Sequence, residues 1–142
     1  MKRILLLLFL LLLLVGCKYK PSDSDIVVGL STEITNIVTF EQFLRNVEEG
    51  KKDEIRIVSY TEEGDPIIQD VKFDGKTIVA KTDTTRDKFG TGKVESISCK
   101  SIGSKKSTDS EKSVEYFLSD CELSQPEDDL WVHLLTVYEK TS

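Results

Sequence analysis

The stretch IRIVSYTEEGDPII, from Ile55 to Ile68, combines dense β-branched and aromatic sequence with a turn signal, and it continues to Phe89-Gly90. Apolar and polar side chains alternate along Ile55–Tyr60, which is typical of a β-strand. The run ends at residues 62–66, where a glycine can supply a positive φ and a proline lacks a hydrogen-bond donor. This segment therefore predicts a loop between two strands.

The same pattern repeats twice further along the chain. A second run, Ile67–Phe73, is followed by Asp74-Gly75, the dipeptide expected of a two-residue type I′ hairpin turn. A third run covers Thr77–Thr82 and again alternates. Together the three runs predict an antiparallel meander, which needs further elements to cover its apolar face.

Four segments carry a resemblance to a known family: Arg56–Thr61, Glu63–Ile67, Phe73–Gly75 and Asp83–Gly90. From about Asp25 through Cys99 the chain resembles a family of small uncharacterised lipoproteins of spore-forming Gram-positive bacteria, a domain of unknown function. Members often carry His-Gly ahead of an Ile-x-Asn, whereas Ile34-Thr35-Asn36 here follows Thr32-Glu33 or Ser31-Thr32, depending on the alignment. The resemblance implies no activity.

The beginning of the chain reads as a lipoprotein signal peptide. Met1-Lys2-Arg3 is basic, Ile4–Val15 is an apolar run shorter than the roughly 20 residues that span a bilayer, and Leu14-Val15-Gly16-Cys17 matches a lipobox. The thiol of Cys17 would accept a diacylglycerol group, and cleavage would free its amine. An ordinary secretory signal or an uncleaved anchor is the alternative interpretation.

This interpretation divides the chain into a signal peptide (1–16), a lipidated Cys17 with a flexible tether (17–25), and one α+β domain (26–142). Residues 17–142 hold 17 basic and 25 acidic side chains, a net charge of about −8. Such an acidic surface argues against nucleic-acid binding. We expect a monomer on the extracytoplasmic face of the cell membrane, which it contacts through the N-terminal lipid.

The sequence predicts one helix. Thr39 precedes Gln42 by three positions, as in a capping box, apolar residues recur at helical spacing to Val47, and Gly50 stands where a helix C′ residue should. We expect this amphipathic helix to cover the meander. Ile26–Val28 is either a short edge strand or a dangling apolar segment.

Three more strands are expected after the meander. They cover Lys93–Ile102, Ser113–Cys121 and Leu130–Tyr138, separated by polar loops at Gly103–Lys112 and Ser124–Asp129. Helix is an alternative for the last run, although its β-branched and aromatic content favours strand. The expected fold is thus α+β, a mostly antiparallel sheet of five or six strands with one amphipathic helix packed on one face.

Two cysteines remain once Cys17 carries the lipid. Cys99 and Cys121 fall near the ends of predicted neighbouring strands in an exported domain, so a disulfide is the favoured interpretation, and a pair of buried free thiols competes with it. A zinc site is disfavoured because the spacing matches no zinc motif and His133, the only histidine, lies in an apolar strand.

The most suggestive polar residues lie in the stretch that carries the resemblance. Carboxylates at strand ends can bind a divalent cation or small ligand, but they more often accept backbone hydrogen bonds in turns. We expect the structural role and leave the identity of any metal open; no catalytic constellation and no cofactor motif is recognisable. The set comprises Arg56, Glu63, Asp65, Asp83 and Asp87.

Three classes of function follow. The first is a membrane-anchored, non-enzymatic binding or accessory protein. The second is a divalent-cation or small-ligand binding domain that uses loop carboxylates. The third, a carboxylate-based cell-wall hydrolase, is disfavoured because the chain is short for an extended cleft and its carboxylates are scattered.

Overall fold

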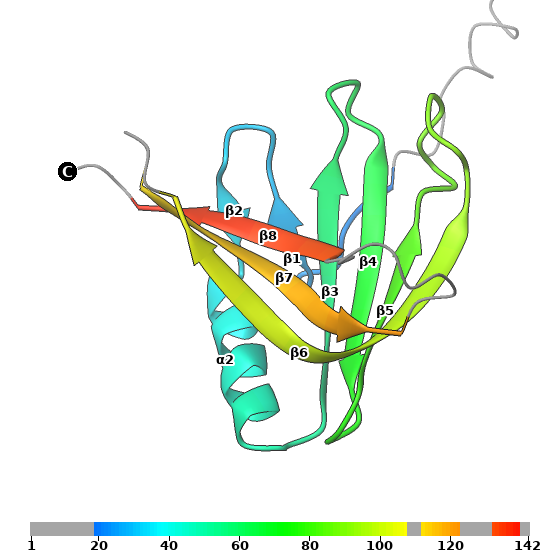
Figure 1. Cartoon of the computed structure of the whole chain (residues 1–142). Helices are drawn as coiled ribbons and strands as arrows, with labels where there is room; N and C mark the ends of the chain where they lie inside the picture. Colours follow the sequence, from blue (N-terminus) through cyan, green and yellow to red (C-terminus); the bar gives the residue numbers. More distant parts are fainter. Residues whose placement is uncertain (1–18, 108–111, 123–131, 140–142) are drawn as a thin grey trace, which may run out of the picture.

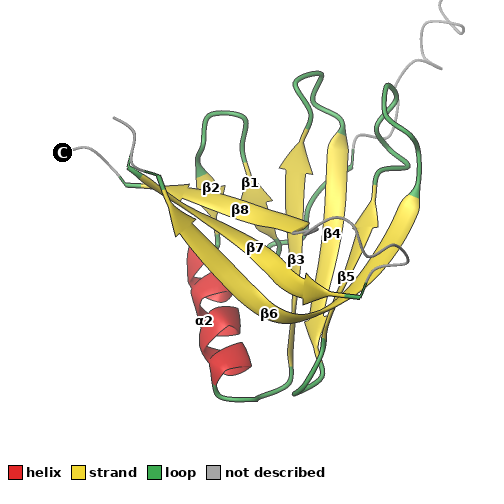
Figure 2. Ribbon diagram, in the orientation of Figure 1, coloured by secondary structure: helices red, strands yellow, loops and turns green. Residues whose placement is uncertain are grey.

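The chain folds into one curled sheet with a helix against it (Figures 1 and 2). The computed structural model describes residues 19–107, 112–122 and 132–139. Within this part of the chain the strands follow one another in the sheet in the order β2-β1-β3-β4-β5-β6-β7-β8. The elements are β1 (Ile26–Val28), β2 (Ile34–Thr35), α2 (Ile37–Glu48), β3 (Asp53–Tyr60), β4 (Pro66–Phe73), β5 (Ile78–Asp83), β6 (Val94–Lys106), β7 (Ser113–Cys121) and β8 (Val132–Tyr138).

The expected sheet of five or six strands with a helix packed on one face is wrong. The described residues form eight strands in a sheet that curls into a nearly closed, barrel-like shape (Figure 1). Two short strands at the N-terminal end add to those expected, and β6 continues past the predicted end at Ile102 to Lys106, well into the predicted loop. The twist of the strand pairs and the long strand β6 curl the sheet around the helix, so the helix does not lie on one face of an open sheet.

β1 is neither an edge strand nor a dangling segment. It lies inside the sheet, antiparallel to β2 on one side and parallel to β3 on the other. A parallel neighbour requires a crossover connection, and here β2 and α2 together supply it. The two-residue β2 was not predicted, because two residues are too few to show an alternating pattern.

The helix begins earlier than the sequence predicts. Its N-cap is Asn36 in the left-handed conformation, with φ 57°, and the residue makes no side-chain cap, so the predicted cap at Thr39 is wrong. The C-terminal prediction is confirmed: Gly50 has φ 70°, its N–H donates to the Val47 carbonyl, and the Lys51 N–H donates to the Asn46 carbonyl. These two bonds form a Schellman motif.

The helix fills the space between the two arms of the curled sheet. Its side chains Phe40 and Phe43 are fully buried, and the Phe40 ring meets Tyr116 of β7 edge-on at 5.2 Å between centroids. A pocket of about 310 Å³ lies between Leu44 and Val47 of the helix and residues 100–104 of β6. The helix therefore connects the N-terminal strands to β7.

The meander from β3 to β5 is confirmed, with one change in a turn. Gly64 has φ 83° in the β3–β4 loop, as expected. In the β4–β5 hairpin the Asp74 N–H donates to the Thr77 carbonyl, so the two loop residues are Gly75 and Lys76. Only Gly75 of these has a positive φ, which excludes the predicted type I′ turn because that turn needs two.

The C-terminal strands agree with the sequence pattern. β7 matches the predicted bounds Ser113–Cys121, and residues 132–138 form a strand, not a helix. A register shift at Tyr116/Phe117 lets both Leu134 and Leu135 of β8 turn inward. The predicted loop at 124–129, the signal peptide and Cys17 lie outside the described residues.

The core fills the inside of the curled sheet. Cys99 and Cys121 are direct cross-strand partners and are joined by a disulfide with an S–S distance of 2.08 Å, so the structure contains the favoured bridge. Gly103 of β6 leaves room for the ring of its partner Phe117. The buried apolar residues of this core are Ile26, Phe40, Phe43, Ile55, Ile57, Val71, Phe73, Ile78, Ala80, Cys99, Leu118, Leu134 and Leu135.

Candidate functional site

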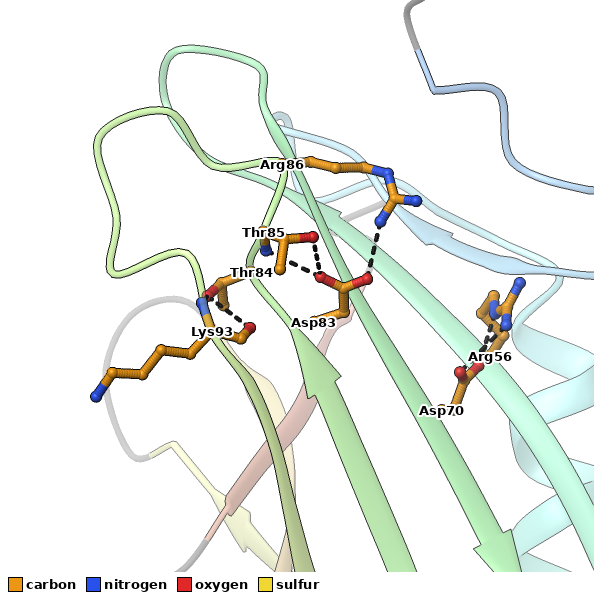
Figure 3. Close-up of polar contacts among 7 residues, drawn as sticks. All are labelled: Arg56, Asp70, Asp83, Thr84, Thr85, Arg86 and Lys93. Carbon is orange, nitrogen blue, oxygen red and sulfur yellow. Dashed lines mark hydrogen bonds and ion pairs between the residues drawn. The ribbon is translucent and has the colours of Figure 1, made fainter.

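The loop between β5 and β6, residues 84–93, is the most highly organised polar region of the described chain, and we call it the β5–β6 loop (Figure 3). Thr84 and Lys93 close its neck with three hydrogen bonds. The Thr84 N–H donates to the Lys93 carbonyl at 2.8 Å, the Thr84 hydroxyl donates to the same carbonyl at 3.1 Å, and the Lys93 N–H donates to the hydroxyl at 3.0 Å. The neck holds the loop in one conformation.

Asp83 holds the first residues of this loop. Its Oδ1 accepts from the backbone N–H of Thr85 at 2.9 Å and from the Thr85 hydroxyl at 2.5 Å, and its Oδ2 accepts from Arg86 Nη1 at 2.9 Å (Figure 3). The Thr85 hydrogen bonds, with the nearby Arg86 charge, lower the pKa of the Asp83 carboxyl. The carboxylate is thus ionised and already surrounded by donors.

Asp87 and Asp65 hold the rest of the loop. Asp87 Oδ1 accepts from the N–H groups of Phe89 at 3.0 Å and Gly90 at 2.9 Å. Asp65, buried in the β3–β4 loop, accepts from the Lys88 N–H at 3.1 Å and pairs with Lys88 Nζ at 3.2 Å. The Lys88 backbone hydrogen bond is the main cause that lowers the pKa of Asp65.

The other two residues of the predicted set lie elsewhere. Arg56 of β3 makes a two-pronged contact with Asp70, its partner on β4: Nε to Oδ1 at 2.6 Å and Nη2 to Oδ2 at 3.1 Å (Figure 3). The Asp70 hydrogen bond raises the pKa of the guanidinium. Glu63 is exposed at the tip of the β3–β4 loop. The structure therefore joins Asp65 to the loop of Asp83 and Asp87 and leaves Arg56 with its own partner.

This arrangement is that of a scaffold. Asp83 and Asp87 accept hydrogen bonds from backbone N–H groups two residues further on, as in Asx turns, and Asp65 accepts one from the Lys88 N–H of the β5–β6 loop. Among the described residues, no three His, Cys, Asp or Glu side chains are placed to share a metal ion. What the carboxylates accomplish together is to fix Arg86, Lys88 and Phe89 in space.

The described N-terminal segment, residues 19–25, lies against this region. The Arg86 guanidinium carbon stands 5.2 Å from the centre of the Tyr19 ring, within the range of a cation–π contact. Asn36 Nδ2 donates to the carbonyls of Asp23 at 2.8 Å and Asp25 at 2.7 Å. The segment predicted to belong to the tether is thus hydrogen-bonded to the domain.

No helix in the described residues is long and apolar enough to cross a membrane.

A cavity of about 290 Å³ opens on the inner side of the sheet, and we call it the inner cavity. Its polar groups come from Ser59, Gln69, Thr82 and the backbone of His133. Gln69 Nε2 is 3.4 Å from both the Thr82 hydroxyl and the His133 carbonyl, so this side chain links β4, β5 and β8. The apolar lining comes from Val28, Ile57, Ile67, Val132, Leu134 and Leu135.

Sequence reasoning missed the residues that line this cavity and those that fix the N-terminal segment. Gln69 shares a strand face with Val71 and Phe73, so a polar group at an inward position was visible in the pattern. The sequence around Tyr19 and Asn36 gives no such signal, because the contacts of these residues depend on how the segment 19–25 lies against the domain.

Comparison with known protein families gives one match. The family described as a domain of unknown function (DUF4362) matches residues 23–116, which reach from the N-terminal segment into β7. No curated protein and no solved structure matches the chain. The match contains all three aspartates and the β5–β6 loop, and it covers more than half of the sequence. The chain belongs to the DUF4362 family.

Proposed function

We propose that this protein is a lipid-anchored, non-enzymatic binding protein of the extracytoplasmic face of the cell membrane. The sequence Leu14-Val15-Gly16-Cys17 supports the anchor. The single observation that carries the binding role is the inner cavity, where a few polar groups converge in an apolar lining, as in ligand sites at the mouths of β-barrels.

The state of the carboxylates argues against a hydrolase. A glycoside hydrolase needs one carboxyl with a raised pKa to act as the acid and a second within reach of the same bond. Asp65 and Asp83 instead have lowered pKa values, and both are engaged by donors of the β5–β6 loop. They stabilise the loop and hold no proton to donate near neutral pH.

The cavity lining indicates the class of ligand. Its lining holds no Asp, Glu, Lys or Arg side chain, and the amide of Gln69 and the hydroxyls of Ser59 and Thr82 offer hydrogen bonds at one side of an apolar wall. A small, uncharged molecule with an apolar body and one or two hydrogen-bonding groups fits this chemistry.

Native mass spectrometry of the protein extracted from its own membranes tests the binding role. Wild-type protein should carry a small-molecule adduct, and Thr82→Phe, which fills the inner cavity, should lose it. Val79→Phe is the matched control, because Val79 lies on the same strand and is 40% exposed. If no adduct is present, or if Thr82→Phe retains it while remaining folded, the cavity is not a binding site.

A further inference from the structure

The β5–β6 loop displays an apolar side chain that packing does not explain. Phe89 is 79% exposed, yet Asp87 bonds its N–H, Asp65 bonds the preceding N–H, and Thr84 with Lys93 closes the loop neck. Single exposed apolar residues are common on protein surfaces. Phe89 differs from them because hydrogen bonds fix the backbone of the loop that exposes it.

This loop also receives the N-terminal end of the described chain. Tyr19 packs under Arg86, and only Lys18 separates Tyr19 from Cys17. Two Cα-to-Cα steps span at most about 8 Å. Tyr19 in turn contacts the β5–β6 loop, which carries Phe89 three residues after Arg86. A lipid on Cys17 therefore leaves the domain on the side of the β5–β6 loop.

We propose that the end of the domain formed by the β5–β6 loop and the β1–β2 loop lies on the lipid bilayer, with Phe89 inserted into its interfacial layer. This inference rests on the lipid anchor of the proposed function. Leu30, which is 66% exposed, projects from the β1–β2 loop at the same end of the sheet (Figure 1). Phe and Leu side chains of this kind bury themselves at the boundary between headgroups and acyl chains.

Charge does not drive this contact. The β5–β6 loop carries Arg86, Lys88 and Lys93 against Asp87. Residues 17–142, however, have a net charge of about −8, with 17 basic and 25 acidic side chains, and Glu62 and Glu63 lie in the β3–β4 loop at the same end (Figure 1). Anionic lipid would repel as much as attract. The apolar ring and the short link to the lipid set the orientation.

In this orientation the three aspartates support the same membrane-facing loop. Asp83 pairs with Arg86, and the Arg86 guanidinium stacks on the Tyr19 ring. Asp65 and Asp87 accept hydrogen bonds from the backbone N–H groups of Lys88 and Phe89. The opposite end of the sheet, with the β4–β5 turn, then points away from the membrane (Figure 1).

Tryptophan quenching in vesicles tests this orientation. Full-length lipidated protein carrying Trp131→Phe and Phe89→Trp is reconstituted into phosphatidylcholine vesicles that contain lipids brominated in the acyl chains. The matched control carries Trp131→Phe and Lys76→Trp, because Lys76 is exposed in the β4–β5 turn. The Phe89→Trp emission should shift to shorter wavelength and lose intensity to the brominated lipid, and the Lys76→Trp emission should do neither.

Three outcomes overturn the inference, and they are distinguishable. Equal quenching of the two variants, with the lipid on Cys17 verified by mass, refutes the orientation alone. Quenching of Phe89→Trp that disappears at 1 M salt, where the Debye length falls to about 3 Å, refutes an apolar contact. Absence of the lipid on Cys17 refutes the proposed anchor and with it this orientation.

Discussion

Reduction of the Cys99–Cys121 disulfide should destabilise the domain strongly. The bridge joins residues 22 apart in the sequence, and the chain-entropy relation for a loop of that length gives roughly 3 kcal/mol of stabilisation. For a domain of little more than a hundred residues this corresponds to a loss of roughly 10 °C in melting temperature. Cys99 is fully buried, so reduction is a cleaner perturbation than a substitution that leaves a polar group in the core.

The assay is thermal unfolding followed by circular dichroism, with and without reductant, on protein carrying Cys17→Ser so that two cysteines remain. Thiol alkylation followed by mass spectrometry reports the redox state of each sample. The double variant Cys99→Ala/Cys121→Ala is the control and should not respond to reductant. An unchanged melting temperature in fully reduced protein would refute the entropic argument, and complete alkylation of untreated protein would refute the bridge itself.

Three further predictions follow from the structure. Thr32→Gly should raise the free energy of unfolding, measured by urea unfolding, by roughly 1 kcal/mol. Thr32 has φ 65°, and the strain of a β-branched residue in this left-handed conformation exceeds the entropy cost of a glycine. A loss of stability would contradict this reasoning. Gly103→Ala should lower the free energy of unfolding by about 1–3 kcal/mol, since the added Cβ would collide with the Phe117 ring. An unchanged urea midpoint would show that the ring moves aside freely. Asp65 and Asp83 have lowered pKa values in the folded protein, so the stability that they contribute is complete above the ordinary aspartate pKa near ~4 and is lost as the pH falls toward their folded pKa values. Asp83→Ala should therefore flatten the acid side of a plot of melting temperature against pH. An unchanged plot would refute the assigned hydrogen bonds of Asp83.

Local pattern was sufficient to predict most individual strands. Alternation and turn residues gave β3, β4, β5 and β7 to within two residues, and β-branched content favoured strand for β8. The helix C-terminus was visible because Gly50 is required there by its positive φ. These features depend on residues adjacent in the chain.

Features that depend on distant residues were not predictable. The parallel pairing of β1 with β3 and the curling of the sheet arise from the crossover through α2 and from the length of β6. The helix start at Asn36 was missed because that residue uses its side chain to bond the carbonyls of Asp23 and Asp25 rather than to cap the helix.

The sequence pattern identifies three residues of the loop cluster, Asp65, Asp83 and Asp87, together with two that lie elsewhere, Arg56 and Glu63. Asp83 and Asp87 accept backbone hydrogen bonds within their own turns, as turn chemistry predicts, whereas Asp65 accepts one from another loop. That all three organise one loop follows only from the approach of the β3–β4 loop to Lys88, 23 residues away from Asp65.

Intact-mass and peptide mass spectrometry of the protein purified from membranes test the proposed lipid anchor most directly. We predict that the mature chain begins at Cys17, carries a diacylglycerol on the Cys17 sulfur, and lacks residues 1–16. The variant Cys17→Ser should keep residues 1–16 and carry no lipid. A chain that is cleaved elsewhere, or a Cys17 peptide recovered without lipid from correctly localised protein, would contradict the account.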